Sequence, residues 1–396
     1  MARVLLACEL GQGDDHVRRA LPLALALRAR GHEPVLALGD LPKVEPALAP
    51  HGLRLLQAPV WRARVGGLPP VHTYTDLMLR HGFVNAQGLR ALARGWRDLV
   101  QLVQPALVLA DHAPVALFAT RGLGVPRLRC GDGFSCPPLA TPMPPMTWWD
   151  ARPEPFDTIG ERNVVHVANQ AAADLGLPAA ASVAELLRAE ADAVCTLPEL
   201  DPYPGRTGTD CCGALAPAVE GAATPWPEGE TASAFVALPA NHPLLEPLVQ
   251  ALQAAGRRAV LQIAGCGPEL AARLTAPGIV VARTPVPVAQ VLRHAAHAVV
   301  DGHTAITQVL LRAGKPLLML PTLLEQVMLA RRVEQLGAGL RLEGEGPDLA
   351  AALWRLSADA GLATAARAFA ERHRDTDDSR TLEAVVARAE ALLAPH

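Results

Sequence analysis

Lysine is almost absent from this chain of 396 residues: Lys43 and Lys315 are the only two, and arginine supplies nearly all of the 36 basic side chains. With 39 acidic residues the formal net charge is −3, and no basic stripe stands out along the sequence. Proteins that bind nucleic acids normally concentrate positive charge on one face. The charge pattern therefore argues against nucleic acid as a partner.

Cysteines are few and irregularly spaced. The seven of them form no C-x-x-C pair, and Cys211 and Cys212 are adjacent. This pattern fits neither a disulfide framework nor a zinc site, so we expect reduced, buried thiols in a cytoplasmic protein. No apolar run reaches the roughly 18 residues of a membrane span, and a short strand-like run follows Met1 where a signal peptide would have a longer apolar stretch. We therefore expect no transmembrane segment.

Two catalytic signatures are also missing. The sequence has no Gly-x-Ser-x-Gly elbow and no P-loop, which argues against a hydrolase or a kinase. What the chain does have is apolar material for real cores, since 50% of its residues are hydrophobic. Its length is about twice that of a usual domain, which predicts two domains.

Short apolar runs alternate with helical patterns along most of the chain, which predicts parallel sheets with helices on both faces. The expected strands are Val4–Leu6, Glu33–Leu38, Leu107–Ala110, Val125–Arg129, Ala234–Leu238, Ala259–Ile263, Ile279–Ala282, Ala298–Asp301 and Pro316–Leu320. A Pro- and Gly-containing stretch at 216–232 reads as a linker. We therefore predict a Rossmann-like α/β domain at 1–215, a second one at 233–375, and a terminal helix at 376–396 that packs back toward the first domain.

The second half contains a candidate anion site. A strand is expected to end at Asp301, followed by a tight turn at Gly302 and a helix that begins near His303. Free amides and the dipole at a helix start favour an anion. The next helix opens with Glu325 and Gln326, which offer a carboxylate and an amide to hydroxyl groups. Together the two helix starts suit a nucleotide-sugar.

The run from Val299 to Leu342 resembles the donor-binding half of GT-B glycosyltransferases of the macrolide and UDP-glucuronosyltransferase type (family 1). It contains a turn from His303 to Gln308, then Gly314-Lys315-Pro316, then Glu325-Gln326, then Ala330 to Gly339, in the family's order and spacing. Glycines of the family's turn are replaced by Thr304 and Ala305, and its Gly-Thr pair by Thr307 and Gln308. The resemblance implies that these residues, with His303, Glu325 and Gln326, bind the donor.

The start of the chain carries the second part of the resemblance. Gly13-Asp14-Asp15-His16-Val17, Leu21-Pro22-Leu23-Ala24 and Arg30-Gly31-His32-Glu33 are similar to the opening motifs of the family, with Arg19 in place of a proline. His16 falls at the position of the family's catalytic histidine, and histidine suits a general base because its pKa lies near neutrality. Asp111, at the end of a buried strand, is the expected orienting carboxylate. His112 is expected to point to a different side of the chain.

The resemblance implies a GT-B protein in which two doubly wound domains face a cleft. It implies an inverting, metal-independent hexosyltransferase that moves a sugar from a UDP or TDP donor to a small-molecule hydroxyl, with no cofactor beyond that co-substrate. A homodimer stays open. The alternatives are a non-catalytic GT-B partner of another transferase, which the altered glycine turn motivates, and a sugar-nucleotide epimerase. A simpler interpretation is also open, in which the four residues are only helix-start or surface residues: His16, Asp111, His303 and Glu325.

The acceptor is expected between segment 61–90 and the loop 133–160, which hold a large share of the chain's few aromatic side chains. Seven prolines within 137–156 exclude a helix or a central strand there. The candidate acceptor residues are Tyr74, Met78, Phe134, Trp148 and Trp149. Met and Trp form adaptable apolar walls, so we expect a largely apolar acceptor. The alternative is that these side chains only pack the loop onto its own domain.

Overall fold

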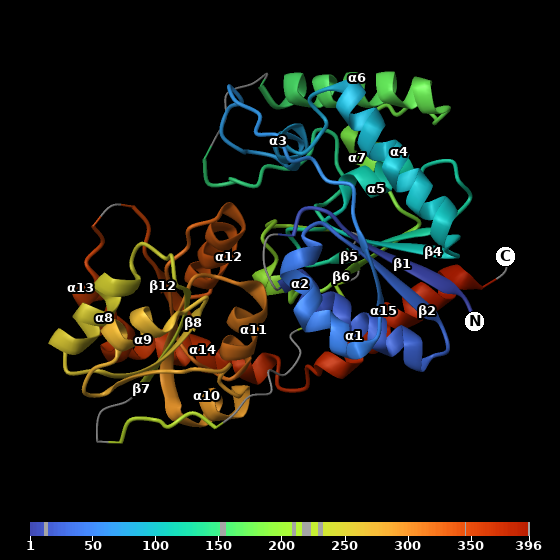
Figure 1. The fold of residues 1–396 in the computed structure, drawn as a ribbon. Helices are drawn as coiled ribbons and strands as arrows, with labels where there is room; N and C mark the ends of the chain where they lie inside the picture. Colours follow the sequence, from blue (N-terminus) through green and yellow to red (C-terminus); the bar gives the residue numbers. More distant parts are fainter. Residues whose placement is uncertain are drawn as a thin grey trace. The chain divides into compact units, whose positions relative to one another are not determined.

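A computed structural model describes residues 1–11, 15–150, 156–207, 211–215, 223–228, 233–344 and 346–394. The chain divides into two compact units (Figure 1). Unit 1 comprises Met1–Leu215 together with Asp377–His396, and unit 2 comprises Ala216–Thr376.

The core of unit 1 is a six-stranded parallel sheet with the strand order β3-β2-β1-β4-β5-β6. Its strands are β1 (Arg3–Cys8), β2 (Glu33–Leu38), β3 (Arg54–Gln57), β4 (Leu107–Asp111), β5 (Arg127–Gly131) and β6 (Ala191–Val194). The central strands are nearly continuous runs of buried Val, Leu and Ala, as expected for a sheet covered on both faces. The first strand pairs with both β2 and β4, and Cys8 at its end lies opposite Asp111.

Helices cover both faces of this sheet (Figure 1). The helices of unit 1 are α1 (Asp15–Ala29), α2 (Leu41–Leu48), α3 (Tyr74–Arg80), α4 (Ala86–Val103), α5 (Pro114–Ala119), α6 (Phe156–Leu175), α7 (Val183–Leu187) and α15 (Asp378–Leu393). The sequence analysis assigned no element to 41–104, yet α4 shows a clear helical period: Leu89, Ala93, Trp96, Val100 and Val103 are buried at intervals of three or four residues. Asn85 caps its start by accepting the Gly88 amide hydrogen.

Helix α15 lies far along the chain but belongs to unit 1. Its residues Val385, Val386 and Ala389 are buried in the same hydrophobic cluster as the strands of the first sheet. The helix packs beside α1, and Arg30 of the segment after α1 pairs with Glu390 of α15.

Unit 2 repeats the topology of unit 1. Its sheet is parallel and has the order β12-β11-β10-β7-β8-β9, so the first and fourth strands of the unit are again adjacent. The strands are β7 (Ser233–Pro239), β8 (Arg258–Ala264), β9 (Ile279–Val281), β10 (Ala295–Val300), β11 (Leu317–Met319) and β12 (Gly339–Arg341). The helices are α8 (Leu245–Ala254), α9 (Pro268–Leu274), α10 (Val288–His294), α11 (Thr304–Arg312), α12 (Leu324–Gln335), α13 (Leu349–Ala358) and α14 (Ala360–Arg372). The prediction of two doubly wound α/β domains is confirmed.

The expected linker at 216–232 lies mostly outside the described residues. Its described part, 223–228, packs on unit 2: the ring of Trp226 stacks on His294 with centroids 5.3 Å apart, and the amide of Thr224 donates to Gln290. Among the described helices, none is long and apolar enough to cross a membrane.

Candidate active site

His16 and Asp111 meet at the carboxyl end of the first sheet. Asp111 is the last residue of β4, and His16 lies in the first turn of α1, the helix that follows β1. Because β1 and β4 are neighbours, the two side chains come together, with His16 Nδ1 3.1 Å from Asp111 Oδ2. Both side chains are largely buried, with exposed fractions of 13% and 16%. The structure thus brings together the two residues that the sequence analysis singled out.

Arg19 completes this cluster, and the sequence analysis did not assign it a role. Its Nε and Nη2 donate to the two oxygens of Asp111, each at 3.2 Å, and its Nη2 lies 2.9 Å from His16 Nδ1. Its Nη1 lies 3.4 Å from Asp132 Oδ2. The sequence did mark this position, because Arg19 lies one helical turn after His16 and stands where the family that the chain resembles has a proline.

Burial and charge act on the pair in opposite directions. Burial lowers the pKa of His16, but the Asp111 carboxylate outweighs it and holds that pKa well above its usual range, with Arg19 opposing the rise. Burial raises the pKa of Asp111, yet Arg19 and His16 bring it well below its usual range. The carboxylate therefore stays charged, and the imidazole binds a proton tightly.

His112 lies on the same side of the chain as His16, so the expectation for it was wrong. Its backbone has φ of 51°, in the left-handed region, which turns the ring back over the strand end. The ring stacks on His16 with centroids 5.8 Å apart and meets the edge of Phe134 at 5.5 Å. Burial, then the charge of His16, lowers its pKa to about 3, so the ring is neutral.

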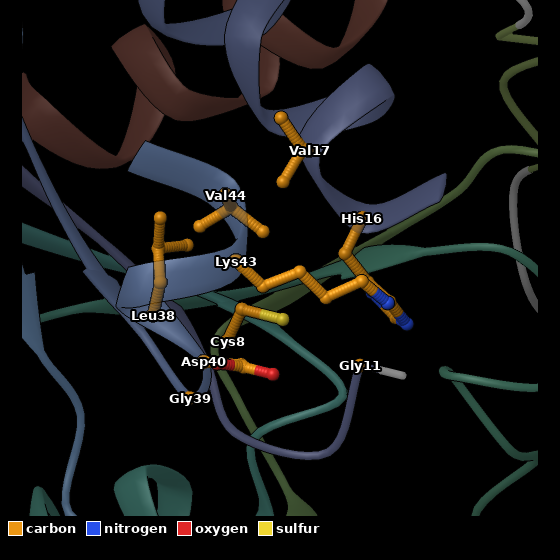
Figure 2. Close-up of a pocket in the computed structure, with 9 residues that line it drawn as sticks. All are labelled: Cys8, Gly11, His16, Val17, Leu38, Gly39, Asp40, Lys43 and Val44. Atoms are coloured by element: carbon orange, nitrogen blue, oxygen red, sulfur yellow. The ribbon is translucent and has the colours of Figure 1, made fainter. Parts of the chain in front are cut away.

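A small hollow opens beside His16 (Figure 2). It is lined by Cys8, Gly11, His16, Val17, Leu38, Gly39, Asp40, Lys43 and Val44. Gly11 touches the imidazole: a Cβ built there would lie 2.3 Å from Cδ2 of His16. Only glycine fits this contact, so the backbone of the β1–α1 loop bounds one side of the ring. Residues Gly13 and Asp14 of the predicted motif lie outside the described residues.

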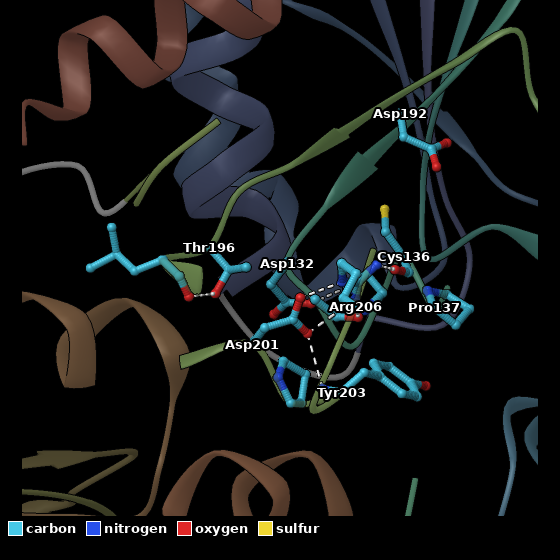
Figure 3. Close-up of polar contacts among 12 residues, drawn as sticks. Asp132, Cys136, Pro137, Asp192, Thr196, Asp201, Tyr203 and Arg206 are labelled. Atoms are coloured by element: carbon cyan, nitrogen blue, oxygen red, sulfur yellow. Dashed lines mark hydrogen bonds and ion pairs between the residues drawn. The ribbon is translucent and has the colours of Figure 1, made fainter. Parts of the chain in front are cut away.

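The turn that follows β5 is anchored to the cluster through Asp132. Its Oδ1 accepts hydrogen bonds from the amide and hydroxyl of Ser135, at 2.8 and 2.7 Å. Arg206 fixes the same turn from the other side by donating to the carbonyls of Gly133 and Cys136 and pairing with Asp201 (Figure 3). The turn carries Phe134, which contacts His112.

Glu9 supports the opposite side of the strand end. Its carboxyl group accepts the amide hydrogens of Val115 and Ala116, in the first turn of α5, the first at 3.0 Å. Burial raises the pKa of Glu9 to about 8, and those two hydrogen bonds oppose the rise. The carboxyl group caps the helix that follows Asp111 and so helps to fix the position of His112.

The candidate acceptor residues divide into two groups. Tyr74 is buried but its ring centroid lies 5.8 Å from that of His112, and Phe134 contacts His112 as well, so both lie near His16. Met78 has no exposed surface, because its face of α3 turns into the core, so its assignment to the acceptor wall was wrong. Trp148 and Trp149 are half-buried and pack edge to face, with centroids 5.2 Å apart.

The loop that carries the two tryptophans is tied to its own domain. Trp148 Nε1 donates to the Pro202 carbonyl at 3.1 Å, and the Met146 amide donates to the His72 carbonyl at 2.7 Å. The side chain of Glu161 accepts the Met143 amide hydrogen. These contacts show that the loop packs onto unit 1, which was one of the two roles expected for it. Residues 151–155 lie outside the described residues.

In unit 2, Asp301 follows β10 and Gly302 makes the turn into α11 with φ of 104°. The His303 ring lies against Asp301, with Nε2 3.3 Å from Oδ2, and remains 38% exposed. Thr304 and Ala305 stand in the first turn of α11 and are half-buried. Free amides at a helix start and an imidazole held by a buried carboxylate can bind an anion.

Three expected donor contacts need correction. The Thr307 amide donates to the His303 carbonyl, so the amides of Thr307 and Gln308 belong to the interior of the helix and are not available to the donor. Thr307 and Gln308 are also buried. The Gln326 oxygen accepts the amide hydrogens of Thr322 and Leu323, and its nitrogen donates to Asp301 at 3.2 Å. Gln326 is thus a buried brace between the two helix starts, and Glu325, half-buried in the first turn of α12, is the accessible member of the pair.

No disulfide joins the seven cysteines, which all lie in the described part of the chain, and only four of them are buried, while Cys211, Cys212 and Cys266 are half-buried. Among the described residues, no group of three or more His, Cys, Asp or Glu side chains is arranged to hold a metal ion.

No protein-family model and no curated protein sequence matches the chain. Solved structures do match over nearly its whole length. The glycotransferase of kitacinnamycin superposes with a TM-score of 0.71 at 19% identity, covering 99% of each chain. Spinosyn rhamnosyltransferase SpnG in complex with spinosyn aglycone has a TM-score of 0.69 at 20% identity, covering 98% of this chain and 100% of the other. Glycosyltransferase SsfS6 of Streptomyces sp. SF2575, in complex with thymidine diphosphate, has a TM-score of 0.63 at 18% identity over 98% and 100%. The chain therefore has the GT-B fold.

Proposed function

We propose that the chain is an inverting glycosyltransferase that moves a sugar from a nucleoside diphosphate donor to a hydroxyl group of a small, largely apolar acceptor. The observation that carries the proposal is the close pair of His16 and Asp111 at the carboxyl end of β1 and β4. In open parallel sheets, ligands bind at that end of the strands, where the strand order reverses. The GT-B fold shared with natural-product glycosyltransferases supports the same reaction class.

In the proposed reaction His16 is the general base. The acceptor oxygen attacks the anomeric carbon, its proton passes to His16 Nε2, and the bond from that carbon to the diphosphate oxygen breaks. Asp111 stabilises the imidazolium that forms and holds the ring in position. Because a single displacement occurs from the face opposite the leaving group, the anomeric configuration inverts.

The donor diphosphate is proposed to bind at the start of α11. The amides of Ala305 and Ile306 and the ring of His303 would take up the charge of the leaving group, which is why we propose that no metal ion takes part. Glu325 is proposed to accept hydrogen bonds from sugar hydroxyl groups. A TDP donor is favoured because SpnG and SsfS6 were both solved with thymidine diphosphate.

The acceptor is proposed to lie against Tyr74, Phe134 and the Trp148–Trp149 pair. The first two rings flank His112, which is itself stacked on the proposed base. An aromatic wall beside the base favours a flat or polyketide-like acceptor, and SpnG was solved with spinosyn aglycone.

The test is a transfer assay with the purified chain. TDP-rhamnose, TDP-glucose and UDP-glucose are each incubated with spinosyn aglycone and other hydroxylated aglycones, in the presence of EDTA, and products are followed by mass spectrometry and NMR. We expect a product heavier by one sugar with inverted configuration. Retention of configuration would contradict direct displacement, conversion of the donor without any acceptor would indicate an epimerase, and failure to use any donor would favour a non-catalytic partner protein.

A further inference from the structure

The inner ring nitrogen of His16 has two neighbours of opposite character. Nδ1 lies 3.1 Å from the Asp111 carboxylate, which can only accept a hydrogen bond, and 2.9 Å from Nη2 of Arg19, which can only donate one. Nδ1 cannot serve both at once. If it donates to Asp111 it must carry a proton, and if it accepts from Arg19 it must not.

Which of these two hydrogen bonds Nδ1 makes decides whether His16 can act as a base. A neutral imidazole has a single N–H, so a ring whose Nδ1 accepts from Arg19 carries its proton on Nε2. That form cannot take a proton from an acceptor hydroxyl. The form that donates from Nδ1 to Asp111 leaves Nε2 free and is competent.

Arg19, which competes with Asp111 for His16 Nδ1, is held in place by other contacts. Its guanidinium spans both oxygens of Asp111 and also reaches Asp132, and its side chain is only 9% exposed. The contact with Asp132 gives the guanidinium a second partner on the far side from His16. The other titratable side chains around the ring are Cys8, Asp40, Lys43 and His112.

We propose that Arg19 is a positioning residue that selects the tautomer of His16. Once the ring is neutral, donation from Arg19 to Nδ1 keeps it in the Nε2–H form, and without that contact Nδ1 donates to Asp111 and Nε2 is free. The purpose of this device rests on the proposed function, but the tautomer itself does not. Asp132, the second carboxylate beside Arg19, also holds the turn that carries Phe134.

The test is the tautomer of His16 in the full chain without ligand. Long-range proton–nitrogen NMR of 15N-histidine-labelled protein distinguishes Nδ1–H from Nε2–H, and His16→Gln assigns the signals. Spectra are taken at a pH above the titration of His16. We expect the Nε2–H form in the wild type. In Arg19→Met we expect the ratio of the two forms to shift toward Nδ1–H by about tenfold or more, because a hydrogen bond to a charged group is lost on one side only.

Arg18→Met is the matched control, one position earlier on the same helix, and should leave the wild-type tautomer unchanged. An Nε2–H form that persists in Arg19→Met would overturn the proposal. So would an Nδ1–H form in the wild type, a measurement that decides the question even where Arg19→Met does not fold. Neither result depends on sugar transfer, so failure of the transfer assay would remove the proposed function and leave the tautomer assignment standing.

Discussion

The two units place an aspartate at the same point of the same topology and use it differently. Asp111 ends β4 and Asp301 follows β10, which are the fourth strands of their units, each beside the first strand. Each aspartate holds an imidazole, at 3.1 Å for His16 and 3.3 Å for His303. Each is followed by a residue with positive φ, at 51° and 104°.

The two sites differ in the further partner of the aspartate and in the exposure of the histidine. Asp111 is shared with the Arg19 guanidinium, whereas Asp301 accepts from the Gln326 amide. His16 is buried, but His303 is more than a third exposed at the start of a helix. A buried imidazole between a carboxylate and a cation suits proton transfer, while an exposed imidazole at a helix start suits an anion. One scaffold thus supports both the proposed base and the proposed donor site.

The largest expected effect is a loss of turnover when His16, the proposed base, is replaced. His16→Ala should lower kcat by about two to four orders of magnitude, because His16 is the group that we propose takes the acceptor proton. Nucleoside diphosphate affinity should stay unchanged. Steady-state kinetics with a saturating donor measures this, and His166→Ala, an exposed position on α6, is the control. Near-normal turnover in His16→Ala would remove the base from the account.

The ionic character of the first site predicts a pH-dependent stability effect. Burial raises the pKa of Asp132, but Arg19 and the hydrogen bonds from Ser135 bring it below its usual value. The stabilisation it contributes is therefore present above about pH 4 and is lost as the pH falls through the lowered pKa. Asp132→Asn should cost about 2–3 kcal/mol of unfolding free energy at pH 7 and progressively less below pH 4. Urea unfolding at several pH values checks this, and a cost that does not change with pH would contradict an ionised Asp132.

Gly302 of the second site predicts a smaller effect, on the free energy of unfolding. A Cβ on Gly302 would lie 3.1 Å from the backbone oxygen of Gln326, and its φ of 104° strains any other residue. Gly302→Ala should therefore lower the unfolding free energy by about 1–2 kcal/mol. The control is Gly267→Ala in the same unit, where no atom lies within 4 Å and φ is −79°. Equal melting temperatures for the two variants would show that the turn tolerates a side chain.

The sequence predicted the sheets well, because the central strands are long runs of buried apolar residues bounded by Gly, Pro and Asp. It predicted no helix or strand over 41–104, although the buried residues of α4 recur at helical intervals with alanines and arginines between them. His16 was found through the resemblance to the family's opening motifs, and Asp111 through that resemblance and because strand ends in a parallel sheet converge on one edge.

The other members of the site were not found, because their roles depend on geometry. Arg19 looks like an ordinary helix arginine until the sheet brings Asp111 and Asp132 to it. The orientation of His112 follows from a left-handed backbone angle that no composition rule predicts for histidine. Gln326 was assigned to the ligand because its spacing allowed that role, and only its hydrogen bonds show that it is committed to the protein.

The most direct test of the division of labour is calorimetric titration of thymidine diphosphate into three proteins: the wild type, His303→Ala and His16→Ala. We expect that the wild type binds, that His303→Ala binds about 10- to 100-fold more weakly through loss of a hydrogen bond to a charged group, and that His16→Ala binds like the wild type. Absence of binding to the wild type, or equal weakening in both variants, would contradict a diphosphate site in unit 2 that is separate from the base in unit 1.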